Sequence, residues 1–205
     1  MAPGWLEKFI VRADASPDAR RTSEKPTLNL QYHSVADHRR TLTVEGETTP
    51  LYEVTRQSVL GAWGSKIHIT APRDGDKDVA LIQYNTFSYQ IKFPARNGHR
   101  IDMSYGKRAF KASGNGLGTL TWKGTGMEVA GAASWELRAE SELVMVVSVD
   151  ATQADGSVTL WKEDLDAQTV EELVMVGASQ IEEYKRMLRN SNKSSVRAVV
   201  NAQAV

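Results

Sequence analysis

The sequence contains no cysteine, which excludes disulfide bonds and cysteine-ligated metal sites. It also has no excess charge of either sign, because 25 Lys and Arg residues balance 25 Asp and Glu residues. A neutral chain has no overall field that would draw it to nucleic acid. We therefore expect no nucleic-acid partner, and only a local patch could bind an anionic surface.

Long apolar runs are missing as well. The longest run, residues 143–147, is far shorter than the roughly 20 residues of a membrane-spanning helix, so we expect no transmembrane segment. The first ten residues have neither the apolar stretch nor the small-residue cleavage site of a secretory signal. These absences predict a cytoplasmic protein, either free or attached peripherally to a membrane.

The chain has enough apolar residues, 41%, to build a core, and its 205 residues suit one domain. Residues 1–26 differ from the rest. Trp5, Leu6, Phe9 and Ile10 fall on one face of a short helix, and a charged stretch rich in Asp, Ser, Pro and Arg follows them. We expect a flexible N-terminal segment whose apolar tip docks on the domain itself or anchors to a membrane or partner.

From residue 27 onward, short strands alternate with turn residues, at a spacing typical of all-β proteins. Pairs such as Asn97-Gly98 and Asp155-Gly156 suit tight hairpins. The expected strands are 27–35, 40–45, 51–58, 66–71, 79–84, 89–93, 100–105, 108–112, 118–123, 134–139, 142–149 and 158–162. Consecutive short strands pair antiparallel, and closure into a barrel would remove exposed edges.

The period then changes to that of a helix over about 167–189, with acidic residues at the front and basic residues at the back. Its cap is either Thr169, in a capping box with Glu172, or Asp166. Residues 173–178 are apolar on every side, which favours a helix enclosed by strands. The sequence thus predicts a mainly β fold over 27–190, an antiparallel closed barrel of about 12 strands around one apolar helix, with a C-terminal tail at 191–205.

Six segments carry a resemblance by their order and spacing: PLYEVTR at 50–56, KIHI at 66–69, VALI at 79–82, TLTWK at 119–123, SWEL at 134–137 and the helix at 170–188. Together they resemble the tubby-like fold, a superfamily that includes tubby C-terminal domains, LURP-one-related proteins and phospholipid scramblases. In most detail they resemble small fungal tubby-like domains of unknown function. The resemblance implies a barrel around a central helix, and lysine and arginine on the barrel wall that bind phosphoinositide head groups.

One stretch, residues 92–111, is rich in cations against a single acid, Asp102. The cations are Lys92, Arg96, Arg100, Lys107, Arg108 and Lys111. Neighbouring antiparallel strands could place several of them on one face, where they would bind a phosphate by charge-assisted hydrogen bonds. They could equally keep edge strands soluble. Trp63, next to Gly64 in a predicted loop, could add an aromatic contact to a ligand.

No motif indicates a catalytic residue, a metal or a cofactor, and we expect none. The four histidines lack metal-binding spacing and are expected on the solvated surface. The glycine-rich residues 113–118 precede a strand, so they favour a hairpin turn over a phosphate-binding loop. The aspartates of 74–78 lack the glycine and the final acid of a calcium loop.

Three functions remain open. The first is a non-enzymatic binding or tethering module for an anionic lipid head group, such as a phosphoinositide. The second is an enzyme, or a carrier of a small apolar ligand, with a pocket at the barrel mouth and acid or base groups among Tyr32, Tyr52, Tyr84, His68, His99 and Glu53. The third is a fungal interaction or self-assembly protein. Because an enclosed helix would fill the barrel, we expect the binding site on the walls or loops.

Overall fold

The computed structural model describes residues 15–36, 38–59, 62–85, 88–104, 108–114, 116–127 and 131–202, without the side chains of 58–59, 62–65, 127 and 190–202. These residues form one twelve-stranded sheet. The strands are β1 (Leu28–Ala36), β2 (Arg39–Val44), β3 (Tyr52–Val59), β4 (Ala62–Ala71), β5 (Lys77–Tyr84), β6 (Ser88–Lys92), β7 (Arg100–Ser104), β8 (Ala109–Lys111), β9 (Thr119–Met127), β10 (Ala133–Ala139), β11 (Glu142–Val149) and β12 (Asp155–Leu160). The helices are α2 (Arg20–Ser23), the 3-10 turn η1 (Pro72–Asp74) and α3 (Ala167–Ala202).

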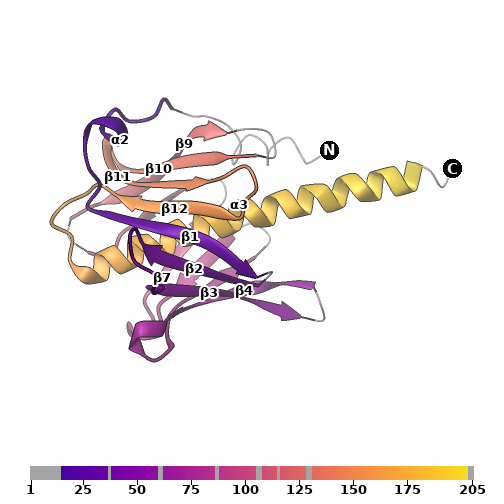
Figure 1. Ribbon diagram of the computed structural model, residues 1–205, viewed down its shortest axis with the longest axis horizontal. Helices are drawn as coiled ribbons and strands as arrows, with labels where there is room; N and C mark the ends of the chain where they lie inside the picture. Colours follow the sequence, from indigo (N-terminus) through magenta and orange to yellow (C-terminus); the bar gives the residue numbers. More distant parts are fainter. Residues whose placement is uncertain are drawn as a thin grey trace.

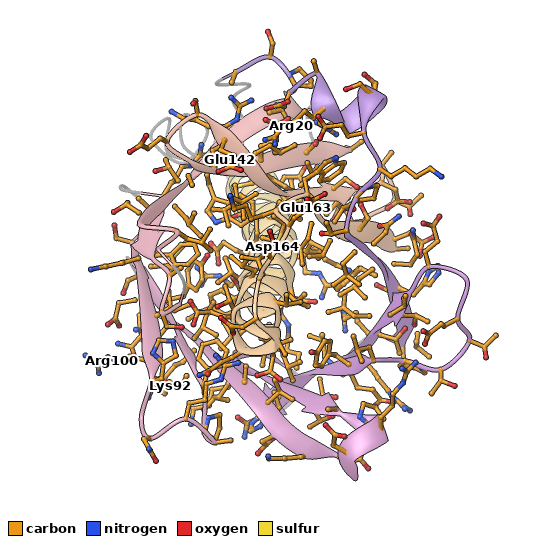
Figure 2. All side chains as sticks on the ribbon, turned by 90° about the vertical axis from the view of Figure 1, so that its left-hand side faces the viewer. Arg20, Lys92, Arg100, Glu142, Glu163 and Asp164 are labelled. Carbon is orange, nitrogen blue, oxygen red and sulfur yellow. The ribbon has the colours of Figure 1, made fainter. Side chains whose placement is uncertain are left out.

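The strands follow the order β7-β6-β5-β4-β3-β2-β1-β12-β11-β10-β9-β8, and every neighbouring pair is antiparallel. The first strand therefore pairs with the last, and the two edge strands, β7 and β8, are consecutive in the chain and lie next to each other. The sheet curls around α3 into a nearly closed barrel (Figures 1 and 2). This confirms the fold class predicted from the strand pattern.

The core of the barrel is filled by α3. Leu173, Met175 and Val176 are fully buried, as the apolar stretch of the helix predicted. The helix also lies close to the wall at Gly177, where an added Cβ would lie 2.7 Å from Cγ1 of Val158 on β12. Such a distance leaves no room for a methyl group, so close packing requires glycine here.

Asp166 caps the start of α3. Its carboxylate accepts a hydrogen bond from the backbone N–H of Thr169 at 2.8 Å and another from the Thr169 hydroxyl at 2.9 Å. These bonds hold the pKa of Asp166 below its usual range. The helix extends past the predicted end at 189 to Ala202, and it projects from the barrel (Figure 1). Residues 190–202 contain neither glycine nor proline, so no helix-stop residue interrupts them.

Residues 15–27, which we call the strap, lie across the outside of the barrel, whereas their polar composition predicted a flexible segment. Hydrogen bonds tie the strap to successive strands: Ala15 to β9, Asp18 to β10, Arg20 to β11 and Thr27 to β12. The strap includes α2, which lies at the top of Figure 1 above β10 and β11. The predicted apolar tip at 5–10 lies outside the described residues.

Candidate functional site

The predicted basic surface is partly assembled on the outer wall at β6 and β7. Lys92 and Arg100 lie directly opposite each other in the ladder between these strands. Because Ile91 and Ile101 beside them point into the core, Lys92 and Arg100 point outward. Arg100 forms an ion pair with Asp102 at 3.1 Å, while Lys92 has no polar partner among the described side chains. Figure 2 shows the two cations together on one wall.

The other predicted members of this surface are spread more widely. Lys111 is exposed on β8, the strand next to β7. Arg108 precedes β8 in a left-handed backbone conformation, φ 46°, with its side chain partly buried. Lys107 lies outside the described residues. The structure therefore brings Lys92 and Arg100 together, with Lys111 one strand away.

Arg96 lies apart from this surface and binds the start of α3. Its guanidinium forms an ion pair with Glu171 and donates to the carbonyl oxygen of Gln168 at 3.0 Å. It also stacks over the ring of Phe93, 4.5 Å from the ring centre. A side chain with these partners fastens the helix to the turn between β6 and β7 and has little freedom to bind a ligand.

Trp63 is in a strand and not in the predicted loop. It belongs to β4 and lies opposite Ser58 of β3, so the hairpin ladder extends further than its glycines indicated. Glycine weakens a strand but does not end one when a partner strand continues beside it. The side chain of Trp63 lies outside the described residues.

A carboxylate, Glu172, closes the barrel mouth at the start of α3. It is fully buried and accepts hydrogen bonds from the backbone N–H of Ser113 at 2.9 Å and from the Ser113 hydroxyl. His99 Nε2 lies 2.9 Å from the same carboxylate, and Arg96 Nη1 lies 3.7 Å away. Ser113 and His99 thus both bind the same carboxylate. We call Glu172 and its partners the mouth clamp.

A second buried carboxylate, Glu182, lies deeper along α3. The Tyr32 hydroxyl of β1 donates to it at 2.5 Å, Arg56 of β3 contacts it at 2.5 Å, and Arg40 of β2 at 3.3 Å. Burial raises the pKa of Glu182, but the guanidiniums of Arg56 and Arg40, with the Tyr32 hydroxyl, outweigh burial and leave that pKa below its usual range. The carboxylate is therefore ionised inside the core.

Lys185 completes this network on the same helix. Its Nζ lies 3.0 Å from the Ser34 hydroxyl and 3.3 Å from the Tyr32 hydroxyl, and 5.0 Å from the Tyr32 ring centre. Burial, reinforced by the nearby arginines and opposed by Glu182, lowers the pKa of Lys185 to about 8. Burial and the charge of Glu182 raise the pKa of Tyr32 well above its usual range, so its phenol stays protonated and donates.

Sequence reasoning missed this network because its members lie on four separate elements. A signal was present nonetheless. Arg40 and Arg56 occupy inward positions in the alternation of their strands, in line with Leu42 and Val54. A charged residue at an inward position needs a buried partner of opposite charge, which the predicted helix at 167–189 could supply.

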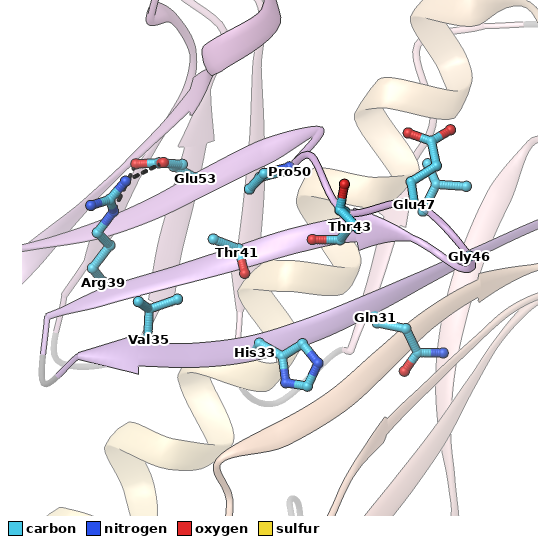
Figure 3. A pocket seen from close by; sticks show the side chains of 12 residues that line it. Gln31, His33, Val35, Arg39, Thr41, Thr43, Gly46, Glu47, Pro50 and Glu53 are labelled. Atoms are coloured by element: carbon cyan, nitrogen blue, oxygen red, sulfur yellow. Dashed lines mark hydrogen bonds and ion pairs between the residues drawn. The ribbon is translucent and has the colours of Figure 1, made fainter.

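Described residues line two hollows on the outside of the barrel. The first, of 570 Å³, runs over β1, β2 and β3 and presents the hydroxyls of Thr41 and Thr43 (Figure 3). Its Arg39 pairs with Glu53 across the strands. Val35, 60% exposed, lines the same hollow. This surface offers neutral hydrogen-bonding groups and little free charge.

The second hollow, of 530 Å³, lies between the strap and the loop before α3. Four acids line it: Glu24, Glu142, Glu163 and Asp164. Arg20 and Lys162 also line it, and Lys162 pairs with Glu142 at 2.8 Å. Figure 2 shows Arg20, Glu142, Glu163 and Asp164 near one another at this end of the barrel. The hollow therefore carries an excess of negative charge.

The acid and base groups expected for an enzyme at the barrel mouth do not form one site. The rings of Tyr32, Tyr52 and Tyr84 are buried, and burial raises the pKa of all three, that of Tyr52 to about 12. His68 and Glu53 lie on the outer wall, and only His99 reaches the mouth. Within the described residues, no set of His, Asp and Glu side chains is arranged to hold a metal ion.

The described helices include none that is both long and apolar enough to cross a membrane. The comparisons with known proteins returned nothing: no family model, curated protein or solved structure matches the chain.

Proposed function

We propose that the protein is a non-enzymatic binding module that holds a phosphate-bearing anion, such as a phosphoinositide head group, on the outer wall at β6–β8. The observation that carries this proposal is the register of β6 and β7, which sets Lys92 opposite Arg100 with both side chains outward. Cross-strand neighbours on one face lie about 5 Å apart, close enough for both to contact one phosphate. Lys111 on the next strand would extend the same surface.

The packing of the interior supports a site on the wall. Residues of α3 occupy the barrel centre, and the mouth clamp occupies the end where α3 begins. A pocket for an enzyme or a carrier would need space at one of these places. A site on the outer wall needs no space inside the barrel, which supports the proposal.

A distant relationship to the tubby-like superfamily is part of the same proposal. The twelve-stranded barrel around one helix supports it, because that is the architecture which the sequence resemblance implied. Tubby domains, one branch of that superfamily, bind phosphoinositides through wall lysines and arginines, which favours the same ligand class here. A cytoplasmic protein attached peripherally to a membrane would follow.

Vesicle sedimentation tests the proposal. We expect the protein to sediment with phosphatidylcholine vesicles that contain a phosphoinositide and not with phosphatidylcholine alone. Replacing Lys92 and Arg100 by alanine should weaken binding about 10- to 30-fold, since each basic residue near an anionic membrane contributes about 1 kcal/mol. Higher salt should weaken it further. Competition by soluble inositol phosphates would separate head-group recognition from insertion into the bilayer.

The matched control is the double variant Lys25→Ala/Lys123→Ala, which removes the same charge from exposed lysines elsewhere on the surface. Equal losses in the two double variants would mean that net charge alone drives binding. Equal sedimentation with neutral and phosphoinositide vesicles would exclude the head group as the ligand.

The projecting end of α3 favours a second candidate, an interaction or self-assembly protein. The helix continues past the barrel to Ala202, and its sequence there repeats Val196, Val199 and Val200 at helical spacing. Such a stripe is typical of helices that pair with another helix or a groove. Light scattering on the full chain and on a chain ending at residue 189 tests this, and a higher mass for the full chain alone would support it.

A further inference from the structure

The strap carries a feature that the wall site does not use. In α2, two arginines precede two hydroxyl residues, Arg20-Arg21-Thr22-Ser23. Thr22 and Ser23 are exposed, and their hydroxyls donate only to the carbonyl oxygen of Ala19 in the same turn, at 3.0 and 3.2 Å. Neither hydroxyl bonds to the barrel in the part of the chain that the structure describes.

We propose that Ser23 is a phosphorylation site for an arginine-directed protein kinase, and that phosphorylation releases the strap from the barrel wall. Kinases choose substrates partly by the charge pattern before the acceptor. Arg20 and Arg21 stand three and two positions before Ser23, where guanidiniums can bind carboxylates of the kinase. Pro17 and Pro26 border the turn and keep α2 short, so little structure must unwind for the segment to enter a kinase cleft.

The reaction is an ordinary phosphoryl transfer from ATP. The Ser23 Oγ attacks the γ-phosphorus, and the new Oγ–P bond forms as the bond from that phosphorus to the β,γ-bridging oxygen breaks. The hydroxyl proton passes to the catalytic aspartate of the kinase, and ADP leaves. The product carries up to two added negative charges on α2.

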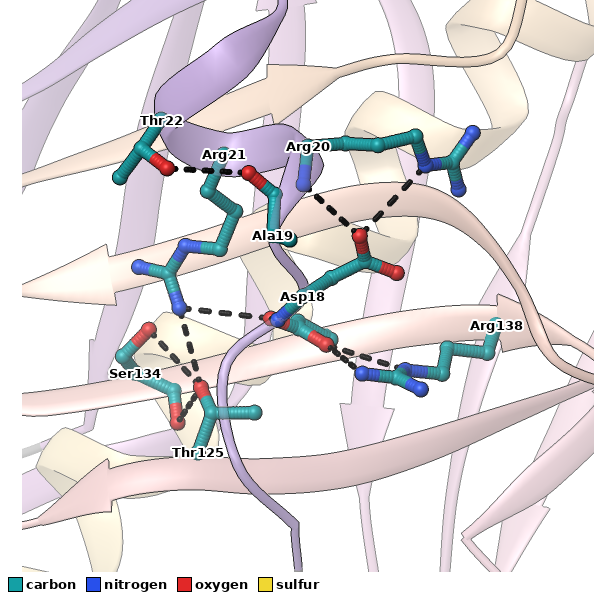
Figure 4. Close-up of polar contacts among 9 residues, drawn as sticks. Asp18, Ala19, Arg20, Arg21, Thr22, Thr125, Ser134 and Arg138 are labelled. Atoms are coloured by element: carbon teal, nitrogen blue, oxygen red, sulfur yellow. Dashed lines mark hydrogen bonds and ion pairs between the residues drawn. The ribbon is translucent and has the colours of Figure 1, made fainter.

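Glu136 of β10 is the main anchor that the strap would leave. This carboxylate is fully buried and accepts the Asp18 N–H at 2.8 Å. Figure 4 labels Asp18, Arg21 and Arg138, which all contact it. Arg21 lies 3.4 Å from it, and Arg138 of the same strand pairs with it at 2.5 Å. Between Asp18 and Arg21, Arg20 donates to the carbonyl oxygen of Leu143 on β11 at 3.0 Å. Two strap arginines thus connect α2 to the wall.

A phosphate on Ser23 acts against these contacts in two ways. Ser23 lies three residues after Arg20, a spacing that puts both side chains on one face of a helical turn, so the phosphate competes with Leu143 for the Arg20 guanidinium. The added charge also lies next to Glu24, which lines the acidic hollow with Glu142 and Asp164. The phosphate and these carboxylates carry like charges, and their repulsion favours release of the strap from the wall.

Kinase treatment of the full chain followed by hydrogen exchange tests both parts. An arginine-directed serine/threonine kinase with Mg²⁺ and ATP should add one phosphate, mapped by mass spectrometry to Ser23. The Asp18 amide, which donates to Glu136, should then exchange at least about tenfold faster. Ser23→Ala should take up no phosphate and keep its slow exchange. Arg138→Gln, which alters the anchor and not the kinase motif, should speed Asp18 exchange without kinase and so calibrate the assay.

Three results would overturn the proposal. If a free peptide of residues 16–27 is phosphorylated while the folded chain is not, Ser23 is not a site in the folded protein. If the Ser23→Ala variant still takes up phosphate, another residue is the phosphorylation site. Phosphate on Ser23 with unchanged Asp18 exchange would contradict release of the strap.

Discussion

The two buried glutamates of α3, Glu172 and Glu182, have the same exposure and very different surroundings. Both are fully buried on one helix. Glu172 is bound at the mouth by side chains on turns, His99 and Ser113, which reach solvent. Glu182 is bound by Arg40 and Arg56, which strands hold in place and which are 2% exposed. The comparison teaches that burial alone does not determine how much stability is lost when a charge is removed. The loss also depends on whether water can take the place of the partners of that charge.

The largest expected effect comes from neutralising the deeper carboxylate. Glu182→Gln keeps the shape of the side chain but removes the charge that Arg40 and Arg56 both contact. Breaking a buried ion pair by removing one partner costs about 3–5 kcal/mol of folding free energy. Urea unfolding of the variant and the natural chain measures the difference.

The matched control is Glu183→Gln, one residue further along the helix. Burial raises the pKa of Glu183, and Arg186, which pairs with it at 3.0 Å, is partly exposed. This variant should lose far less stability. Equal losses at 182 and 183 would show that the strand arginines add nothing to the network.

A second prediction concerns the pH dependence of stability, which Lys185 of the Glu182 network should dominate. Lys185 has a pKa of about 8 in the folded protein against 10.5 in the unfolded chain. Above the folded pKa, the unfolded state binds more protons than the folded state, so the free energy of unfolding rises with pH. We expect a rise of about 1 kcal/mol between about pH 8 and pH 9, below the range where tyrosines ionise.

The same pH series on Lys185→Met isolates this contribution, because the variant keeps the apolar stem and removes the amine. Its unfolding free energy should be flat over the interval. If the unfolding free energy of Lys185→Met still rises with pH, a group other than Lys185 causes the pH dependence.

The sequence predicted the barrel better than it predicted the contacts of the two buried glutamates. Strand alternation and the all-round apolar stretch of α3 were enough for the barrel, since each is a local pattern set by burial. The choice between Asp166 and Thr169 as helix cap needed the structure, because both residues fit the cap pattern. Glu172 looked like a capping residue, yet it binds Ser113 and His99 across the mouth. Contacts between residues so distant in sequence leave no local period to detect.

The wall site shows the same limit. The cations of 92–111 were visible as a cluster in the sequence, but their directions depend on register. Ladder pairing puts Lys92 beside Arg100, while the turn between β6 and β7 carries Arg96 to the helix. A charge run in sequence becomes a surface only where the strands align it.

At the mouth, the expected effect is smaller than at Glu182. Glu172→Gln should lower the unfolding free energy by about 1–3 kcal/mol, because it weakens bonds that the carboxylate receives from Ser113 and His99. The partners are on turns and can find water, so the loss should stay below that of Glu182→Gln. Urea unfolding of the two variants side by side makes the comparison, and the reverse order would contradict it.

The smallest effect sharpens the comparison at one hydrogen bond. Ser113→Ala removes the hydroxyl donor to Glu172 and keeps the backbone N–H that donates at 2.9 Å. We expect a loss of about 1 kcal/mol, since a single bond to a charged acceptor is lost and water can reach the turn. The matched change at the deeper site is Tyr32→Phe, which removes one hydroxyl donor to Glu182 inside the core. Because Tyr32 is itself fully buried while Ser113 is exposed, Tyr32→Phe should cost more than Ser113→Ala, and equal losses would mean that exposure of the donor makes no difference.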